Sequence, residues 1–215
     1  MAWWPFSRPI LLPKAKTLPN DNKNRPIYEI FDDYWEHFFT VNTWSKIYDA
    51  LEDHHAYDLR DLRDLSLITE GQRVFLSVSR LHAEIMNGGF EQYLWNVGYL
   101  TDDLIDCLKI AGLQALASDV EDAWNALKAA HAQIKFEDHE IDNYGPGSPG
   151  FDWTQSYNAI AAKSAALFRL DNEFASERDC HTRQLVEDKG GYELDILKAL
   201  VAYADANMGQ FVEQT

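Results

Sequence analysis

The sequence predicts an all-α fold: a single domain of about eight to ten packed helices preceded by an extended, proline-rich arm. Three observations support this. Apolar residues recur at three- and four-residue spacings along most of the chain, no convincing stretch alternates apolar with polar residues, and five of the seven prolines lie in residues 1–27. With 215 residues, 46% of them hydrophobic, the chain can bury a substantial core.

The first 27 residues predict an extended arm. Prolines four to seven residues apart prevent a regular helix and favour polyproline-like geometry. Residues 1–27 hold five basic residues and one acidic residue, whereas the acidic domain predicted over residues 28–215 holds 14 basic and 34 acidic residues. Apolar side chains such as Trp3, Trp4 and Leu12 can dock on the acidic body or on a second subunit, and a partly ordered tail is the alternative.

Helical periodicity begins directly after the arm. Helices are expected over residues 28–38 and from about 44 to 54, because aromatic and aliphatic residues recur there at helical spacing. Residues 58–65 place a leucine and an aspartate at every third position, which predicts a short helix with separate apolar and acidic faces.

A long helix is expected to begin after Thr69, a plausible N-cap. Apolar residues from Val74 to Ile85 follow at i, i+4, i+7 and i+11. We expect this helix to stop at Gly88 and Gly89, because glycine readily adopts the left-handed conformation of a helix C-cap.

In the second half of the chain, Thr101 with Asp102 and Asp103 predicts the capped start of a helix that runs to Gly112. The glycine- and proline-rich residues 142–150 predict a loop. The remaining helices are expected over residues 119–134, 154–171 and 192–206, with a weaker one at 176–188.

No pattern in the sequence identifies a catalytic, metal or cofactor site, so we expect none of the three and assign no enzymatic activity. Cys107 and Cys180 have no metal-like spacing, and they are expected to be two reduced thiols, with a single bridge as the alternative. His54 and His55 are neighbours, which on a helix point about 100° apart and cannot share one metal ion. No apolar run approaches the roughly 18 residues of a membrane span, so a cytoplasmic protein without membrane contact is expected.

The acidic excess is the strongest compositional signal. A net charge of −16 argues against direct binding to nucleic acid. Spread evenly, the carboxylates would average about one per 300 Å² of surface, against about one per 100 Å² on duplex DNA, so only clustering on one face can imitate DNA. Some acids have a local explanation, since they complement helix dipoles. The candidate partner contacts are Asp58, Asp61, Asp64, Asp102, Asp103 and Asp106.

Residues 84–96 (EIMNGGFEQYLWN) form the most distinctive segment. They resemble the signature of the DNA mimic protein, C-terminal-domain-like family, in which a helix ends in Asn-Gly-Gly-Phe-x-Gln-Tyr. The resemblance covers about residues 65–207. A structural role at a helix corner is expected for the motif, with Gln92 and Asn96 satisfying freed backbone groups, and a ligand site is the alternative. The motif residues are Glu84, Asn87, Gly88, Gly89, Phe90, Gln92 and Tyr93.

The resemblance implies an all-helical fold that is often dimeric, and its named member presents acidic surface to a DNA-binding regulator in place of DNA. We therefore expect a non-enzymatic protein whose partner has a basic surface. An immunity or antitoxin-type protein that neutralises a toxin is the alternative. An enzyme with a polar pocket near Glu84, Asn87, Gln92 and Tyr93 is a third reading. The basic arm departs from the family pattern.

Overall fold

The computed structural model describes residues 11–17, 19, 25–130 and 192–213, and this part of the chain is helical. Its β-type pairing is limited to an isolated bridge between Ala15 and Val212. The predicted all-α, single-domain fold is therefore confirmed. None of the described helices is both long enough and apolar enough to cross a membrane.

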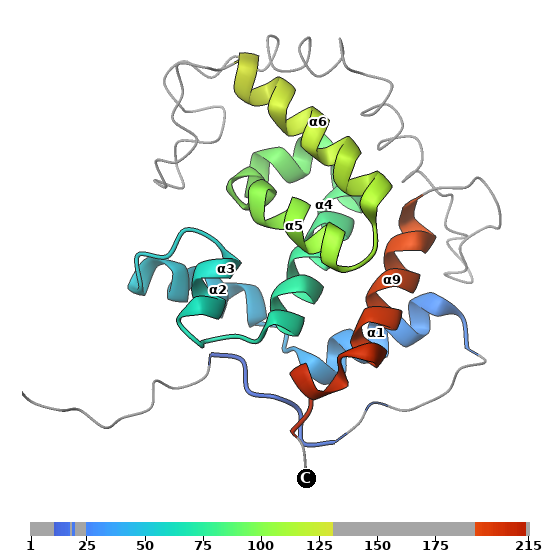
Figure 1. The fold of residues 1–215 in the computed structure, drawn as a ribbon. Helices are drawn as coiled ribbons and strands as arrows, with labels where there is room; N and C mark the ends of the chain where they lie inside the picture. Colours follow the sequence, from blue (N-terminus) through green and yellow to red (C-terminus); the bar gives the residue numbers. More distant parts are fainter. Residues whose placement is uncertain (1–10, 18, 20–24, 131–191, 214–215) are drawn as a thin grey trace, which may run out of the picture.

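Helix α4 occupies the centre of the domain, where it packs against α3, α5 and α9 (Figure 1). Helix α1 lies along α9, and α6 packs on α5. The described elements are α1 (Ile27–Phe38), α2 (Thr43–Asp53), α3 (Leu59–Asp64), α4 (Glu70–Val97), η1 (Gly98–Leu100), α5 (Thr101–Ile110), α6 (Gln114–Ala130), α9 (Tyr192–Ala206) and η3 (Met208–Gln210).

Most predicted helix starts are confirmed, because the signals that set them are local. Thr69 caps α4: its side chain accepts a hydrogen bond from Gln72 N, and the Gln72 side chain accepts one from Thr69 N in return, which forms a capping box. The Asp58 side chain caps α3 by accepting a hydrogen bond from Asp61 N. The helix predicted over residues 192–206 matches α9.

The predicted helix stop at Gly88 and Gly89 is wrong, because α4 continues to Val97. Glycine inside a helix costs about 1 kcal/mol relative to alanine. The burial of Phe90 and Tyr93 just beyond the glycines is a gain of larger size, which favours continued helix.

Two further starts differ from the prediction. Thr101 is the first residue of α5 and does not cap it: its hydroxyl donates to Gly98 O (2.6 Å). Helix α6 begins at Gln114, five residues before the predicted start, because Gly112 (φ +85°) ends the preceding turn and the next residues re-enter a helix at once. The predictions for residues 131–191, including Cys180, lie outside the described residues.

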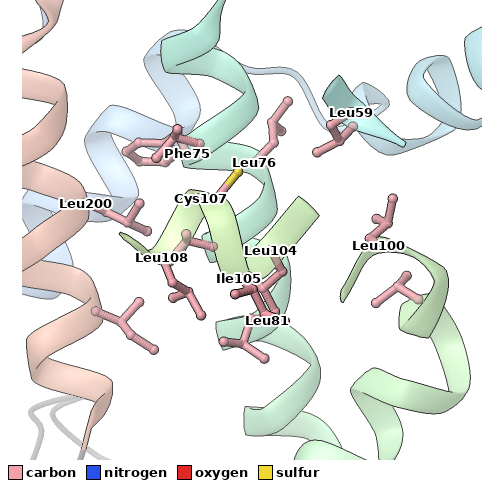
Figure 2. Close-up of a cluster of buried hydrophobic side chains, with 14 of the residues drawn as sticks. Leu59, Phe75, Leu76, Leu81, Leu100, Leu104, Ile105, Cys107, Leu108 and Leu200 are labelled. Atoms are coloured by element: carbon pink, nitrogen blue, oxygen red, sulfur yellow. The ribbon is translucent and has the colours of Figure 1, made fainter. Parts of the chain in front are cut away.

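The core contains an aromatic cluster around Phe75. Its ring centroid lies 5.5 Å from that of Phe31, 5.6 Å from that of Phe39 and 5.9 Å from that of Phe211, so α1, α4 and the C-terminal segment meet there. Figure 2 shows a neighbouring cluster of leucines in which Cys107 lies; its thiol is free and buried.

The described part of the arm docks on the body, one of the two possibilities that the sequence left open. Leu11 N donates to Leu67 O (2.9 Å), and Ala15 N donates to Phe211 O (2.8 Å). The arm therefore joins the C-terminal segment and the start of α4, while Trp3 and Trp4 lie outside the described residues. The domain boundary at residue 27 stays a prediction.

The closest approach between α4 and the C-terminal segment yields a test of this packing. A Cβ atom on Gly71 would lie 2.5 Å from Gln210 Cβ and 3.0 Å from the Phe211 ring. Gly71→Ala is therefore expected to lower the free energy of unfolding by about 1–3 kcal/mol, measured by urea denaturation. Gly98→Ala is the matched control, with an expected change below about 1 kcal/mol, because its Cβ would meet atoms at 3.9 Å. Equal effects of both substitutions would contradict the described packing.

Candidate functional site

The three candidate aspartates of α3 bind groups of their own segment. Asp58 Oδ1 accepts from Asp61 N (3.0 Å), and Asp61 Oδ2 accepts from Tyr57 N (2.7 Å). Asp64 is exposed, and its carboxylate pairs with Arg63 (2.8 Å). Two of the three thus stabilise the start of the helix, which is the local role that acids at a helix start can have.

The candidate acids of α5 differ strongly in exposure. The Asp102 side chain is 68% exposed and accepts from Trp124 Nε1 (2.9 Å) and Lys128 Nζ (3.3 Å), which link it to α6. The Asp106 side chain is 47% exposed, and it accepts from Arg73 Nη2 (2.8 Å). Asp102 and Asp106 are therefore both available at the surface, although each already has a basic partner.

Asp103 is not a surface residue. Its side chain is fully buried and pairs with Arg73, while Arg60 lies 3.8 Å away. The Cys107 thiol donates to the second carboxylate oxygen of Asp103 (3.7 Å between heavy atoms). In the folded protein, Asp103 therefore cannot contact a partner.

The buried guanidinium group of Arg73 links the start of α4 to the start of α5. Besides Asp103 and Asp106, Arg73 binds both carboxylate oxygens of Glu70, at 2.8 and 3.0 Å. Burial of a charge without such partners would be strongly unfavourable. Arg63 also pairs with Glu70 (3.0 Å), so three arginines, counting Arg60, lie among the candidate acids and neutralise part of their charge.

The pKa values of these carboxyl groups move in opposite directions. Burial raises the pKa of Asp103 to about 6, even though Arg73 opposes the shift. The hydrogen bond from Arg73 lowers the pKa of Asp106. For Glu70, burial alone would raise the pKa, but the hydrogen bonds from Arg73 and Arg63 outweigh it and lower the value.

Helix α2 carries exposed acids that are not among the partner contacts predicted from the sequence. Asp49, Glu52 and Asp53 fall at i, i+3 and i+4, so they share one face of the helix. No ion pair or side-chain hydrogen bond connects these three with the other described residues. The i, i+3, i+4 spacing of these acids is visible in the sequence, and it is the signal that predicts a shared acidic face. Among the described residues, no group of His, Cys, Asp or Glu can hold a metal ion.

The family motif converges on a buried carboxylate, that of Glu84. Glu84 pairs with Arg80 (2.5 Å) and accepts from Gln92 Nε2 (3.1 Å) and Asn96 Nδ2 (2.7 Å). The prediction that Gln92 and Asn96 bind freed backbone groups is therefore wrong for their side-chain NH2 groups. Both of these groups donate to the carboxylate of Glu84. The Arg80 guanidinium also lies over the Trp44 ring, 5.1 Å from its centroid.

These contacts require a sharp bend in α4. In a straight helix, residues 12 positions apart are separated by about 18 Å along the axis, which is more than the two side chains can span. Because Asn96 and Glu84 are hydrogen-bonded, the axis of α4 changes direction between Glu84 and Asn96, a segment that contains Gly88 and Gly89. A corner therefore exists where the sequence predicted one, without an end to the helix.

The remaining motif residues do not join Glu84 in a polar pocket. Asn87 is exposed. Tyr93 is buried and stacks on Phe90, with ring centroids 5.7 Å apart, and burial raises the pKa of its hydroxyl. Neither Asn87 nor Tyr93 is a hydrogen-bond partner of Glu84, so the described contacts are those of a structural corner.

Helix α4 lies within a segment that matches a known protein family. A family model described as DMP19-like protein matches residues 66–207, nearly the range of the resemblance read from the sequence. No curated protein and no solved structure matches the chain.

Glu84 provides a test of the corner. Glu84→Ala leaves the donors of Arg80, Gln92 and Asn96 without their acceptor, and it is expected to lower the free energy of unfolding by about 2–4 kcal/mol in urea denaturation. Asn87→Ala, at an exposed position of the same corner, is the control, with an expected change below about 0.5 kcal/mol. A Glu84→Ala variant as stable as the control would refute the role of this carboxylate.

The opposite pKa shifts predict a stability maximum on the acid side of neutrality. The folded-state pKa of Asp103 is raised above its ordinary value of 3.8, so the folded state binds a proton first and the free energy of unfolding rises as pH falls from 7 to about 5. Asp106 and Glu70 have lowered values, and their contribution is lost as pH falls below about 4. Denaturation across pH 3–8 measures this profile.

The matched variants for this profile are Asp103→Asn, which removes the buried titrating group, and Asp64→Asn, which removes an exposed one. The rise between pH 7 and 5 is expected to disappear only in Asp103→Asn. A profile with the same slope in both variants would show that Asp103 does not titrate in this range.

Proposed function

The chain belongs to the DMP19-like family, and on that basis we propose that it is a non-enzymatic binding protein that occupies the basic surface of a DNA-binding protein in place of DNA. The family match carries the proposal. The net charge of −16 supports it, because a surface that binds the DNA backbone is rich in lysine and arginine and attracts carboxylates by the same electrostatics.

The exposed acids of α2 are the strongest candidate for the contact surface. Cβ atoms three or four residues apart on a helix are separated by about 5–6 Å, similar to the spacing of successive phosphates on a DNA strand. Asp49, Glu52 and Asp53 have this spacing, and none of them forms an ion pair with a described basic side chain, although Lys46 lies three residues before Asp49 on the same helix. Asp102 and Asp64 are exposed but already paired, which favours α2 over them.

Two variants with equal net charge test this surface. Asp49→Asn/Glu52→Gln/Asp53→Asn removes the α2 acids, and Glu36→Gln/Asp122→Asn/Asp195→Asn removes three exposed acids elsewhere. Partners are captured from a native lysate with the wild type, and the affinity of each variant is then measured with the purified partner. We expect at least a roughly tenfold loss for the α2 variant and less than about threefold for the control.

Competition with duplex DNA decides the kind of partner. Under the proposal, DNA displaces the partner and the affinity falls steeply as salt rises. A partner that DNA cannot displace would overturn DNA mimicry and favour the toxin-neutralising alternative. Equal losses for the two charge variants would show that the contact surface is not on α2.

A further inference from the structure

Residues 11–17 lie on the body as an extended segment, and we propose that the trough they occupy is a docking site for an extended basic segment of the partner, which the arm covers in the free protein. The arm trough is defined by four groups: Leu67 O, the Gln72 side-chain amide, Phe211 O and Glu213 N. The class of partner rests on the proposed function, whereas the trough rests on the contacts below.

The arm is bound mainly through its backbone. Leu11 N donates to Leu67 O (2.9 Å), Ala15 N donates to Phe211 O (2.8 Å), and Glu213 N donates back to Ala15 O (2.9 Å). Main-chain pairing of this kind accepts any extended segment, and it is the basis of recognition by strand addition. The main-chain hydrogen bonds of the trough therefore do not depend on the side chains of the arm.

Leu12 supplies the side-chain anchor. It is only 4% exposed and belongs to the same core cluster as Leu67 and Phe211, while Gln72 Nε2 donates to its carbonyl oxygen (3.0 Å). When the arm leaves, an apolar site and several main-chain hydrogen-bonding groups become exposed together. A replacement segment therefore needs an aliphatic residue at the position of Leu12.

The charge of the arm indicates which segment fits. Lys14 and Lys16 flank Ala15, and Lys14 Nζ donates to Gly209 O. The arm is the basic part of a chain whose residues 28–215 carry 20 more acidic than basic residues. A basic extended segment, of the kind that DNA-binding proteins use to contact the DNA backbone, has the same chemistry as the arm.

The walls of the trough are held together without the arm. Thr69 Oγ1 donates to Gln210 O (2.8 Å), and Gly71 lies against the Phe211 ring. These contacts fix the C-terminal segment on the first turn of α4. We therefore expect the trough to persist when the arm is released, as a preformed site.

A labelled peptide of residues 8–19 tests the trough in the full-length chain. In the wild type, the tethered arm competes at an effective concentration near the millimolar range, so the peptide binds weakly. Leu12→Asp releases the arm, because it places a charge in the apolar site, and we expect peptide affinity to rise at least roughly tenfold by fluorescence anisotropy. Val41→Asp is the matched control, since Val41 is fully exposed and its affinity should equal that of the wild type.

Hydrogen exchange at Glu213 N shows independently whether the arm has left, because this amide donates to Ala15 O. If Leu12→Asp impairs folding, Ala15→Pro removes the donor to Phe211 O without adding a charge. Release of the arm with no gain in peptide affinity would overturn the inference, and so would equal exchange in wild type and both arm variants. The assay contains no partner protein, so its failure leaves the proposed function standing, and failure to capture a basic partner leaves the trough standing.

Discussion

Among the described residues, the packing of three helices depends on one buried guanidinium group, that of Arg73. Arg73 connects the start of α4 to the start of α5 through Glu70, Asp103 and Asp106, and Arg60 brings α3 to the same place. A charge without solvent is tolerated only where its donors are satisfied, so the three helices must keep this arrangement as one unit. The leucine core of α4 and α5 is packed around the same junction (Figure 2).

This junction also decides what the protein presents to a partner. Of the three acids that balance Arg73, Glu70 and Asp106 stay partly exposed, whereas the carboxylate of Asp103 is removed from the surface altogether. Negative potential must then come from acids that no arginine reaches, and the exposed face of α2 is such a place. Under the proposed function, the contact with a basic surface depends on particular helix faces, since the net charge of the whole chain is averaged over paired and buried groups.

At both the bend of α4 and the docked arm, one polar side chain binds several groups at once. Glu84 gathers donors from both sides of the bend, which allows one helix to pack along two directions in the core. At the other end of α4, the side chain of Gln72 takes part in the capping box and also binds the carbonyl of Leu12. The first turn of α4 thus joins the described part of the arm to the C-terminal segment.

The sequence by itself determined the helical class, the net charge and most helix positions, because apolar spacing, prolines and caps such as Thr69 act over a few residues. It also located the corner near Gly88, though not its continuous backbone. Only the tertiary structure decided which acids are exposed. Asp103 and Asp49 are equivalent as acidic residues in the sequence, and one is buried because Arg73, 30 positions away, lies against it. Pairing of charges across such separations follows from how the helices pack, which no local pattern records.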